Sequence, residues 1–181
     1  ENMAAAVAPF LTGPDQVVAV AMPQDSWHIV ASHLGVLRAG GTLVVLDTTL
    51  PDALTSHMIN DAQPVVILTR GSDNFRGLPT LNVLTLPERA PKRIPPSWMD
   101  DPSQRLATIF YTSGTTGMPK GVMHNFAAFA WSIAAVRKRL RFDEDSRVLS
   151  YLPLSHVAER TLVEHGMLAS GMHVFFAESL E

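Results

Sequence analysis

Short apolar runs alternate with longer amphipathic segments through the first half of the chain. Residues 17–22, 42–46 and 65–69 are continuous apolar stretches next to Pro or Gly, which predicts buried strands. Residues 26–38 and 52–62 lie between these runs and predict helices. Strands that alternate with helices in this way pair with one another in parallel. The pattern therefore predicts an α/β fold with a mostly parallel open sheet flanked by helices.

The remaining elements follow from the same reading of apolar runs and helix-stop residues. A short helix is predicted over 3–11, and a weaker strand over 81–86. In the second half, strands are predicted over 106–111, 121–124, 148–152 and 173–177, with one helix over 126–140 behind an Asn125 cap and another that runs from a Ser155 cap to Ser170.

A proline-rich stretch separates the two halves. Residues 87–105 hold five of the chain's thirteen prolines, so this stretch cannot form a regular helix or a central strand. We expect an α/β subdomain over 1–86, a linker over 87–105, and a second α/β segment over 106–181. All three would belong to one domain.

Composition narrows the class of protein. The chain has 181 residues, 46% of them apolar, which is enough for a real core. A net charge of −3 provides no positive potential that would attract nucleic acid. The lack of cysteine excludes disulfides and metals held by thiolates. No signal peptide or spanning segment is evident, so we expect a cytoplasmic protein. The start at Glu1-Asn2-Met3 and the abrupt end at Glu181 lead us to expect a piece of a longer chain.

The most informative stretch is Tyr-Thr-Ser-Gly-Thr-Thr-Gly-Met-Pro-Lys-Gly over 111–121. Between two apolar strands it holds four small hydroxyl side chains, three glycines and one lysine. Hydroxyls and bare backbone N–H groups suit phosphate oxygens, glycine lets the backbone come close, and lysine supplies a point charge. The spacing fits neither the nucleoside-triphosphate P-loop nor the dinucleotide fingerprint. The stretch predicts an anion-binding loop.

The order of residues in this loop resembles the phosphate loop of the adenylate-forming superfamily, which includes acyl-CoA synthetases, luciferases and adenylation domains of peptide synthetases. The resemblance implies that the loop holds the β- and γ-phosphates of ATP. The residues it assigns to this role are Thr112, Ser113, Gly114, Thr115, Thr116, Gly117 and Lys120. It also implies that a loop hydroxyl, Thr112 or Thr115, helps to hold Mg²⁺.

A second block carries the same resemblance. Residues 35–47 are similar to the Leu-Lys-Ala-Gly-Gly-x-x-x-x-Leu-Asp-Pro block of the superfamily, with Thr48 in place of the usual proline. The family role of this block is helix–strand packing. Gly40 and Gly41 would then end the helix and let it pack closely against the strand.

The third block is Leu-Pro-Leu-Ser-His-Val-Ala-Glu-Arg over 152–160. It resembles the Leu-Pro-x-x-His-x-x-Glu-Arg block of long-chain acyl-CoA synthetases, which implies that His156 lines the carboxylate or acyl site. We expect Glu159 and Arg160 to pair with other segments in a structural role, and we regard His124 as a weaker site candidate. A zinc set and a serine hydrolase are rejected, because their spacings are absent. The other histidines, His28, His33, His57 and His173, give no constellation.

The resemblance implies an ATP-dependent, AMP-forming acid–CoA ligase that activates a long-chain fatty acid as an acyl adenylate and passes it to coenzyme A. The stretches that bind adenine and ribose and the C-terminal lobe with its adenylation lysine are not in this sequence. We therefore expect the chain alone not to turn over. Two alternatives stay open, a piece of an amino-acid adenylation domain and an inactive nucleotide-binding module. Peripheral contact with a membrane also stays open.

Overall fold

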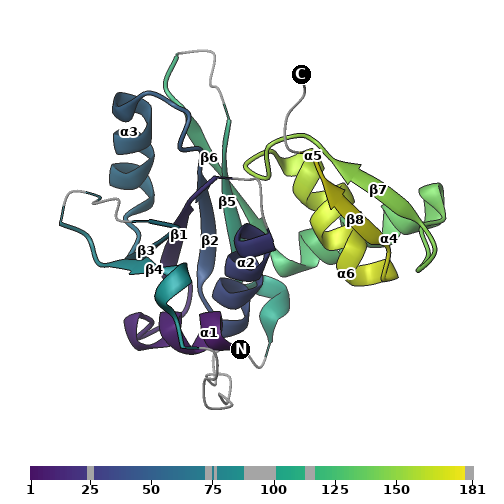
Figure 1. Cartoon of the computed structure of the whole chain (residues 1–181), viewed down its shortest axis with the longest axis horizontal. Helices are drawn as coiled ribbons and strands as arrows, with labels where there is room; N and C mark the ends of the chain where they lie inside the picture. The colour runs from purple at the N-terminus through teal and green to yellow at the C-terminus, as the bar shows by residue number, and fades with distance from the viewer. Residues whose placement is uncertain (24–26, 72–74, 76, 88–100, 113–116, 178–181) are drawn as a thin grey trace.

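The computed structural model describes residues 1–23, 27–71, 75, 77–87, 101–112 and 117–177. Within these residues a six-stranded sheet has the order β4-β3-β1-β2-β5-β6, and β7 and β8 form a separate parallel pair (Figure 1). In the large sheet the first five strands pair in parallel, and β6 pairs antiparallel with β5. Its strands are β1 (Val17–Ala21), β2 (Thr42–Leu46), β3 (Val66–Thr69), β4 (Thr80–Asn82), β5 (Leu106–Thr112) and β6 (Lys120–Asn125). The predicted fold class is confirmed.

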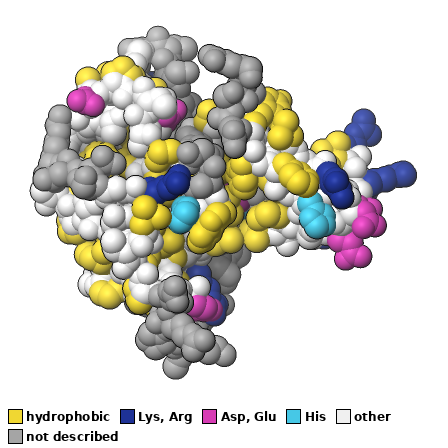
Figure 2. Space-filling model, in the orientation of Figure 1, with side chains coloured by type: hydrophobic (Ala, Val, Ile, Leu, Met, Phe, Trp, Pro, Cys, Tyr) yellow, Lys and Arg dark blue, Asp and Glu magenta, His cyan; other side chains and the backbone are white. Residues whose placement is uncertain are grey.

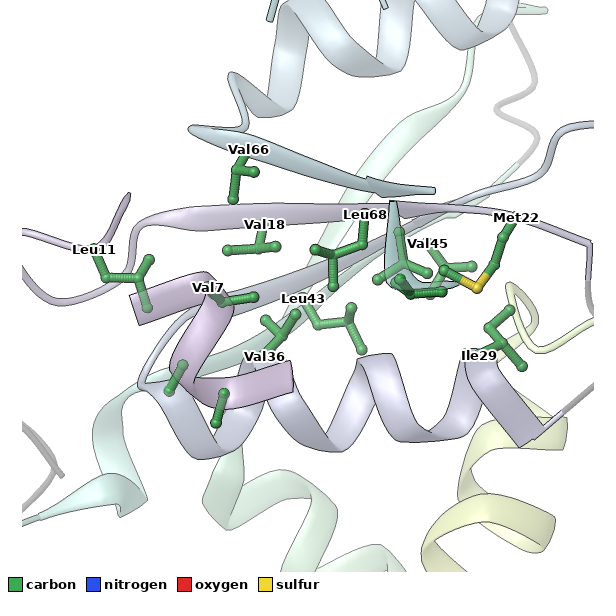
Figure 3. Packing of buried hydrophobic residues seen from close by; sticks show 14 of the residues in the cluster. Val7, Leu11, Val18, Met22, Ile29, Val36, Leu43, Val45, Val66 and Leu68 are labelled. Carbon is green, nitrogen blue, oxygen red and sulfur yellow. The ribbon is translucent and has the colours of Figure 1, made fainter. Parts of the chain in front are cut away.

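Both faces of the central strands are buried, which explains why their sequences read as unbroken apolar runs. Alternate side chains point to opposite faces. Val18 and Leu43 belong to the cluster under α1 (Asn2–Val7), η1 (Ala8–Phe10) and α2 (Trp27–Ala39) (Figure 3). Ala19 and Val44 belong to the cluster under α3 (Asp52–Ala62).

The Gly40-Gly41 pair performs the packing role that its motif predicts. Gly40 adopts a φ of 95°, a left-handed conformation that ends α2 without strain. A Cβ on Gly41 would lie 3.2 Å from Val18 Cγ2 and 3.3 Å from Val36 Cγ1. The missing side chain therefore lets the end of the helix sit against the first strand.

The part of the chain that follows β6 packs beside the large sheet as a smaller layer (Figure 1). Its elements are α4 (Phe126–Leu140), β7 (Arg147–Ser150), α5 (Val157–Glu159), η5 (Arg160–His165), α6 (Gly166–Ser170) and β8 (His173–Phe176). The predicted Asn125 cap is confirmed, because the Ala128 N–H donates to Asn125 Oδ1 at 2.8 Å. On the face in Figure 2, charged side chains of both signs gather at the end away from the large sheet. No helix in the described part of the chain has the length and apolarity to cross a membrane.

Three expectations about local structure are corrected or fall outside the described part. The expected strand over 81–86 is short: β4 ends at Asn82, whose side chain accepts from the Leu84 N–H and starts the 3₁₀ turn η2 (Val83–Thr85). The helix expected from Ser155 begins instead at Val157, with His156 as its N-cap. The linker expected over 87–105 lies largely outside the described residues. Of it, Pro102–Gln104 forms the 3₁₀ turn η4 ahead of β5.

The middle of that helix, η5, is a π-helix rather than an α-helix. The wider turn of a π-helix places residues four and five apart on one side. Here those residues are Arg160, Glu164 and His165, and all three are buried against the large sheet and its neighbouring helices. Tertiary polar contacts thus override the local preference for a regular helix.

Candidate functional site

Of the expected phosphate-binding residues, Thr112 is the last residue of β5, Lys120 is the first residue of β6, and Gly117 lies three positions before β6. Ser113, Gly114, Thr115 and Thr116 lie outside the described residues. Thr112 and Lys120 are paired directly across the two strands, and both are exposed. Directly paired residues present their side chains on the same face of an antiparallel ladder. The hairpin therefore brings a hydroxyl and an ammonium together at the mouth of the loop.

Two cavities adjoin Thr112. One, of about 250 Å³, lies between α3 and the strand ends and has Leu50, Leu54 and Met58 in its wall. The other, of about 310 Å³, has His156 and Phe110 in its wall. Tyr111, Thr112 and Ser155 line both cavities. The structure thus brings His156 and Thr112, two predicted site residues 44 positions apart in the sequence, to a common cavity.

A larger cavity, of about 900 Å³, lies on the other side of the large sheet. Its wall is formed by α1, α2 and the segment after β4, with Trp27 and Leu84 among its residues. None of the predicted site residues that the structure describes lines it. Volume alone therefore does not identify the site in this chain.

His156 is exposed and stands at the N-terminus of α5. Its Nδ1 accepts a hydrogen bond of 3.2 Å from the Ala158 N–H. A ring nitrogen that accepts carries no proton, so the proton of the neutral imidazole is on Nε2. The cap therefore leaves His156 with a free N–H donor suited to a carboxylate oxygen.

Glu159 holds the turn that leads to His156. Its Oε1 accepts from the Ser150 hydroxyl at 2.7 Å and from the Tyr151 N–H at 3.0 Å. Both donors lie at the end of β7, so the carboxylate ties the start of the helix to that strand. The expectation that Glu159 pairs with another segment is confirmed.

Arg160 is fully buried. Its NH1 group donates to Thr108 Oγ1 at 3.0 Å, and the Thr108 hydroxyl donates to the Leu43 carbonyl at 2.7 Å. The guanidinium carbon lies 4.5 Å from the centre of the Phe110 ring. This chain of contacts joins η5 to β5 and β2, and it confirms the expected pairing of Arg160.

The buried network continues into α2. His33 Nδ1 lies 2.7 Å from Glu164 Oε2, and Arg160 Nε lies 3.8 Å from the same oxygen. Burial alone would raise the pKa of Glu164, but the neighbouring His33, Arg160 and His165 lower it to about 2. Burial lowers the pKa of Arg160 to about 10, so the ion pair stays charged at neutral pH. Burial also lowers the pKa of His33, which therefore donates as a neutral imidazole.

This network predicts a loss of stability in mild acid. Burial lowers the pKa of His165 from 6.5 to about 4. Between these values the unfolded chain binds more protons than the folded one, so the free energy of unfolding falls as the pH falls through this window. We expect a loss of about 3 kcal/mol from this residue, measured by urea denaturation from pH 7 to 4. His165→Leu should flatten the dependence, and an equally steep curve in that variant would contradict the assignment.

No site constellation was predicted for His33 and His57, and the contact that each makes with another segment was missed. His33 pairs with Glu164, and His57 Nε2 lies 2.9 Å from the Pro119 carbonyl oxygen at the end of the loop. A signal for His33 was available, because it stands among the core positions of an amphipathic helix. His124, the weaker site candidate, is half-buried and packs edge-on against Phe110, at 5.5 Å between ring centres.

Comparisons with known proteins agree with this geometry. The model of the family described as AMP-binding enzymes matches residues 1–181. The chain is 32% identical over 143 residues to the nonribosomal peptide synthetase easA of Emericella nidulans, a match over 76% of this chain and 2% of that protein. It is 33% identical over 153 residues to the nonribosomal peptide synthetase vlms of a Lecanicillium species, over 77% of this chain and 2% of that protein. The chain thus spans only a small part of these relatives.

A solved structure with a similar fold is the o-succinylbenzoate coenzyme A synthetase of Bacillus subtilis in complex with AMP. The two superpose with a TM-score of 0.83 at 24% identity, over 99% of this chain and 48% of that one. At this identity the likeness is one of fold. The fold of this chain therefore corresponds to about half of that synthetase chain.

Proposed function

The chain belongs to the family of AMP-binding enzymes, which form adenylates, and on this premise we propose that it supplies the polyphosphate-binding part of an ATP-dependent acid ligase. In the proposed reaction a carboxylate oxygen attacks the α-phosphorus of ATP. An acyl–phosphate bond forms, the bond to the bridging oxygen breaks, and pyrophosphate leaves. The pairing of Thr112 with Lys120 at the mouth of the loop is the observation that carries this proposal.

The proposed roles follow from the charge that the reaction develops. Pyrophosphate leaves with additional negative charge, so donors already in place beside it lower the barrier. Lys120 would supply the positive charge, and the Thr112 hydroxyl together with Ser113–Gly117 would donate to the β- and γ-phosphates. A divalent cation such as Mg²⁺, held in part by Thr112 or Thr115, would neutralise phosphate oxygens.

The class of acid is the finer part of the proposal. The tautomer that accepts from the Ala158 N–H presents the Nε2–H of His156 beside a cavity lined by Phe110, Leu152 and Val157. An N–H donor beside an apolar cavity wall suits a carboxylate that carries a hydrocarbon tail. The same donor provides no negative charge to pair with an α-ammonium group. We infer a long-chain carboxylic acid as the substrate and coenzyme A as the acceptor of the acyl group.

A second candidate is activation of an amino acid for a carrier protein. It is favoured by the relatives above 30% identity, which include the nonribosomal peptide synthetases easA and vlms. This candidate needs an acidic side chain close to the α-ammonium group. Asp47 is the acidic residue among the described residues that line the neighbouring cavity beside Thr112, and it would supply this carboxylate.

We expect ATP to shift the backbone amide signals of Thr112 and Lys120 in the isotope-labelled chain. A further addition of decanoate should shift the ring signals of His156, while phenylalanine should leave them unchanged. Nuclear magnetic resonance titration at neutral pH measures both effects, with His156→Gln as the matched variant that removes the imidazole. No response to ATP would overturn the proposed function. A response of His156 to phenylalanine alone would favour the second candidate.

A further inference from the structure

Helix α3 makes three hydrogen-bond contacts with the stem of the phosphate-loop hairpin. They come from the side chains of His57 and Asp61, which are one helical turn apart, and from the backbone carbonyl of Met58. The contacts reach Tyr111 at the end of β5 and Pro119 just before β6. One helix thus holds both ends of the loop.

The contact at Pro119 controls the backbone beside Lys120. His57 Nε2 lies 2.9 Å from the Pro119 carbonyl oxygen. A carbonyl oxygen can only accept, so His57 carries the proton on Nε2 and donates it. Proline restricts its own φ, and the histidine holds the following peptide plane. The direction in which Lys120 leaves the loop is therefore set from α3.

The contact at Tyr111 controls the other end. The Tyr111 hydroxyl lies 2.6 Å from Asp61 Oδ2 and 3.2 Å from the Met58 carbonyl oxygen. Burial, together with the adjacent Asp61 carboxylate, raises the pKa of Tyr111, so the hydroxyl stays protonated and remains the donor. Thr112 is the next residue along the strand. Its position at the mouth of the loop depends on this anchor.

Gly121 allows the helix to come this close. A Cβ on Gly121 would lie 2.9 Å from Ile109 Cγ2, 3.5 Å from Tyr111 Cζ and 3.6 Å from Asp61 Oδ2. Because Gly121 has no side chain, the Tyr111 ring and the Asp61 carboxylate have room to meet beside it. In the described sheet β6 is an edge strand paired only with β5. The hairpin is consequently steadied by α3 rather than by another strand.

We propose that His57 and Asp61 are positioning residues that orient the polyphosphate-binding loop by holding Pro119 and Tyr111. This inference rests on the proposed function, because it assigns to α3 the preorganisation of that loop. A loop held in its binding geometry loses less conformational entropy when the ligand arrives. Neither side chain needs to touch the ligand for this effect.

The test uses pairs of variants that differ in one hydrogen-bonding group. His57→Leu removes the donor, whereas His57→Gln keeps an amide N–H. Asp61→Ala removes the acceptor, whereas Asp61→Asn keeps a carbonyl oxygen, and Tyr111→Phe removes the hydroxyl. Asn60→Ala, at an exposed position of the same helix, is the matched control. Two readouts are measured for each variant: the affinity for tripolyphosphate by calorimetry, and amide hydrogen exchange at Thr112, Lys120 and Gly121.

We expect His57→Leu, Asp61→Ala and Tyr111→Phe each to weaken tripolyphosphate binding roughly three- to tenfold, the loss that one hydrogen bond implies. Exchange at the three amides should become faster by a similar factor. His57→Gln, Asp61→Asn and Asn60→Ala should stay close to the parent chain. Asp61→Ala combined with Tyr111→Phe should be no worse than Tyr111→Phe alone, because the phenylalanine already lacks the hydroxyl that bonds to Asp61.

Two results would overturn the proposal. One is unchanged amide exchange at Thr112 and Lys120 in His57→Leu and Asp61→Ala. The other is an equal loss in Asp61→Asn and Asp61→Ala, which would indicate that the charge matters and not the bond to Tyr111. If the parent chain does not bind tripolyphosphate, the proposed function fails. The exchange measurement then still decides whether α3 holds the hairpin.

Discussion

Replacing Arg160 with alanine is expected to lower the free energy of unfolding by about 3–5 kcal/mol. Arg160 has no exposed surface, and its removal leaves the Glu164 carboxylate buried without its cationic partner. The Thr108 hydroxyl also loses the donor that now bonds to it, and Phe110 loses the guanidinium over its ring. The expected loss is a large share of the roughly 5–15 kcal/mol that typically holds a domain together.

Urea denaturation at pH 7 measures this loss, and Arg139→Ala is the matched control. Arg139 is exposed in the last turn of α4, so its removal should change the free energy of unfolding by less than about 0.5 kcal/mol. The double change Arg160→Met and Glu164→Leu should recover part of the stability, since it removes both charges together. A loss below about 1 kcal/mol in Arg160→Ala would contradict a network that holds η5 to the sheet.

Replacing Lys120 with alanine is expected to weaken the binding of ATP and tripolyphosphate by about 10- to 100-fold, the loss that a hydrogen bond to a charged group implies. Lys120 is exposed, so no buried partner loses a contact when its side chain is removed. The free energy of unfolding should therefore change by less than about 0.5 kcal/mol. Lys120→Arg should retain most of the affinity, because it keeps the charge.

Calorimetric titration of each nucleotide, beside urea denaturation of the same samples, separates affinity from stability. Lys138→Ala is the matched control, since Lys138 is an exposed lysine on α4, away from the hairpin. The control should leave the affinity for tripolyphosphate unchanged. Equal losses of stability and affinity in Lys120→Ala would count against a role in phosphate binding.

The two halves of the candidate site were predictable to different degrees. The loop over 111–121 is contiguous, so its hydroxyls, glycines and lysine identify it without any tertiary information. His156 was recognised through a resemblance of sequence blocks, but its shared cavity with Thr112 depends on how η5 and α5 pack against β5. The contacts of His57 and Asp61 with the hairpin were missed, because they join residues 50 to 62 positions apart in the sequence.

Local pattern alone determined the central strands and the helices over Trp27–Ala39, Asp52–Ala62 and Phe126–Leu140, and it predicted the phosphate loop. Each of these depends on residues close together in the sequence, through side-chain periodicity, capping and the backbone freedom of glycine. Tertiary structure decided the rest. The π-helical turn at Arg160–His165 exists because its buried charges find partners on β5 and α2. Helix α3 forms its hydrogen bonds with the ends of the loop because Gly121 leaves room for them. Charges and hydrogen bonds act through distances in space, which no local pattern encodes.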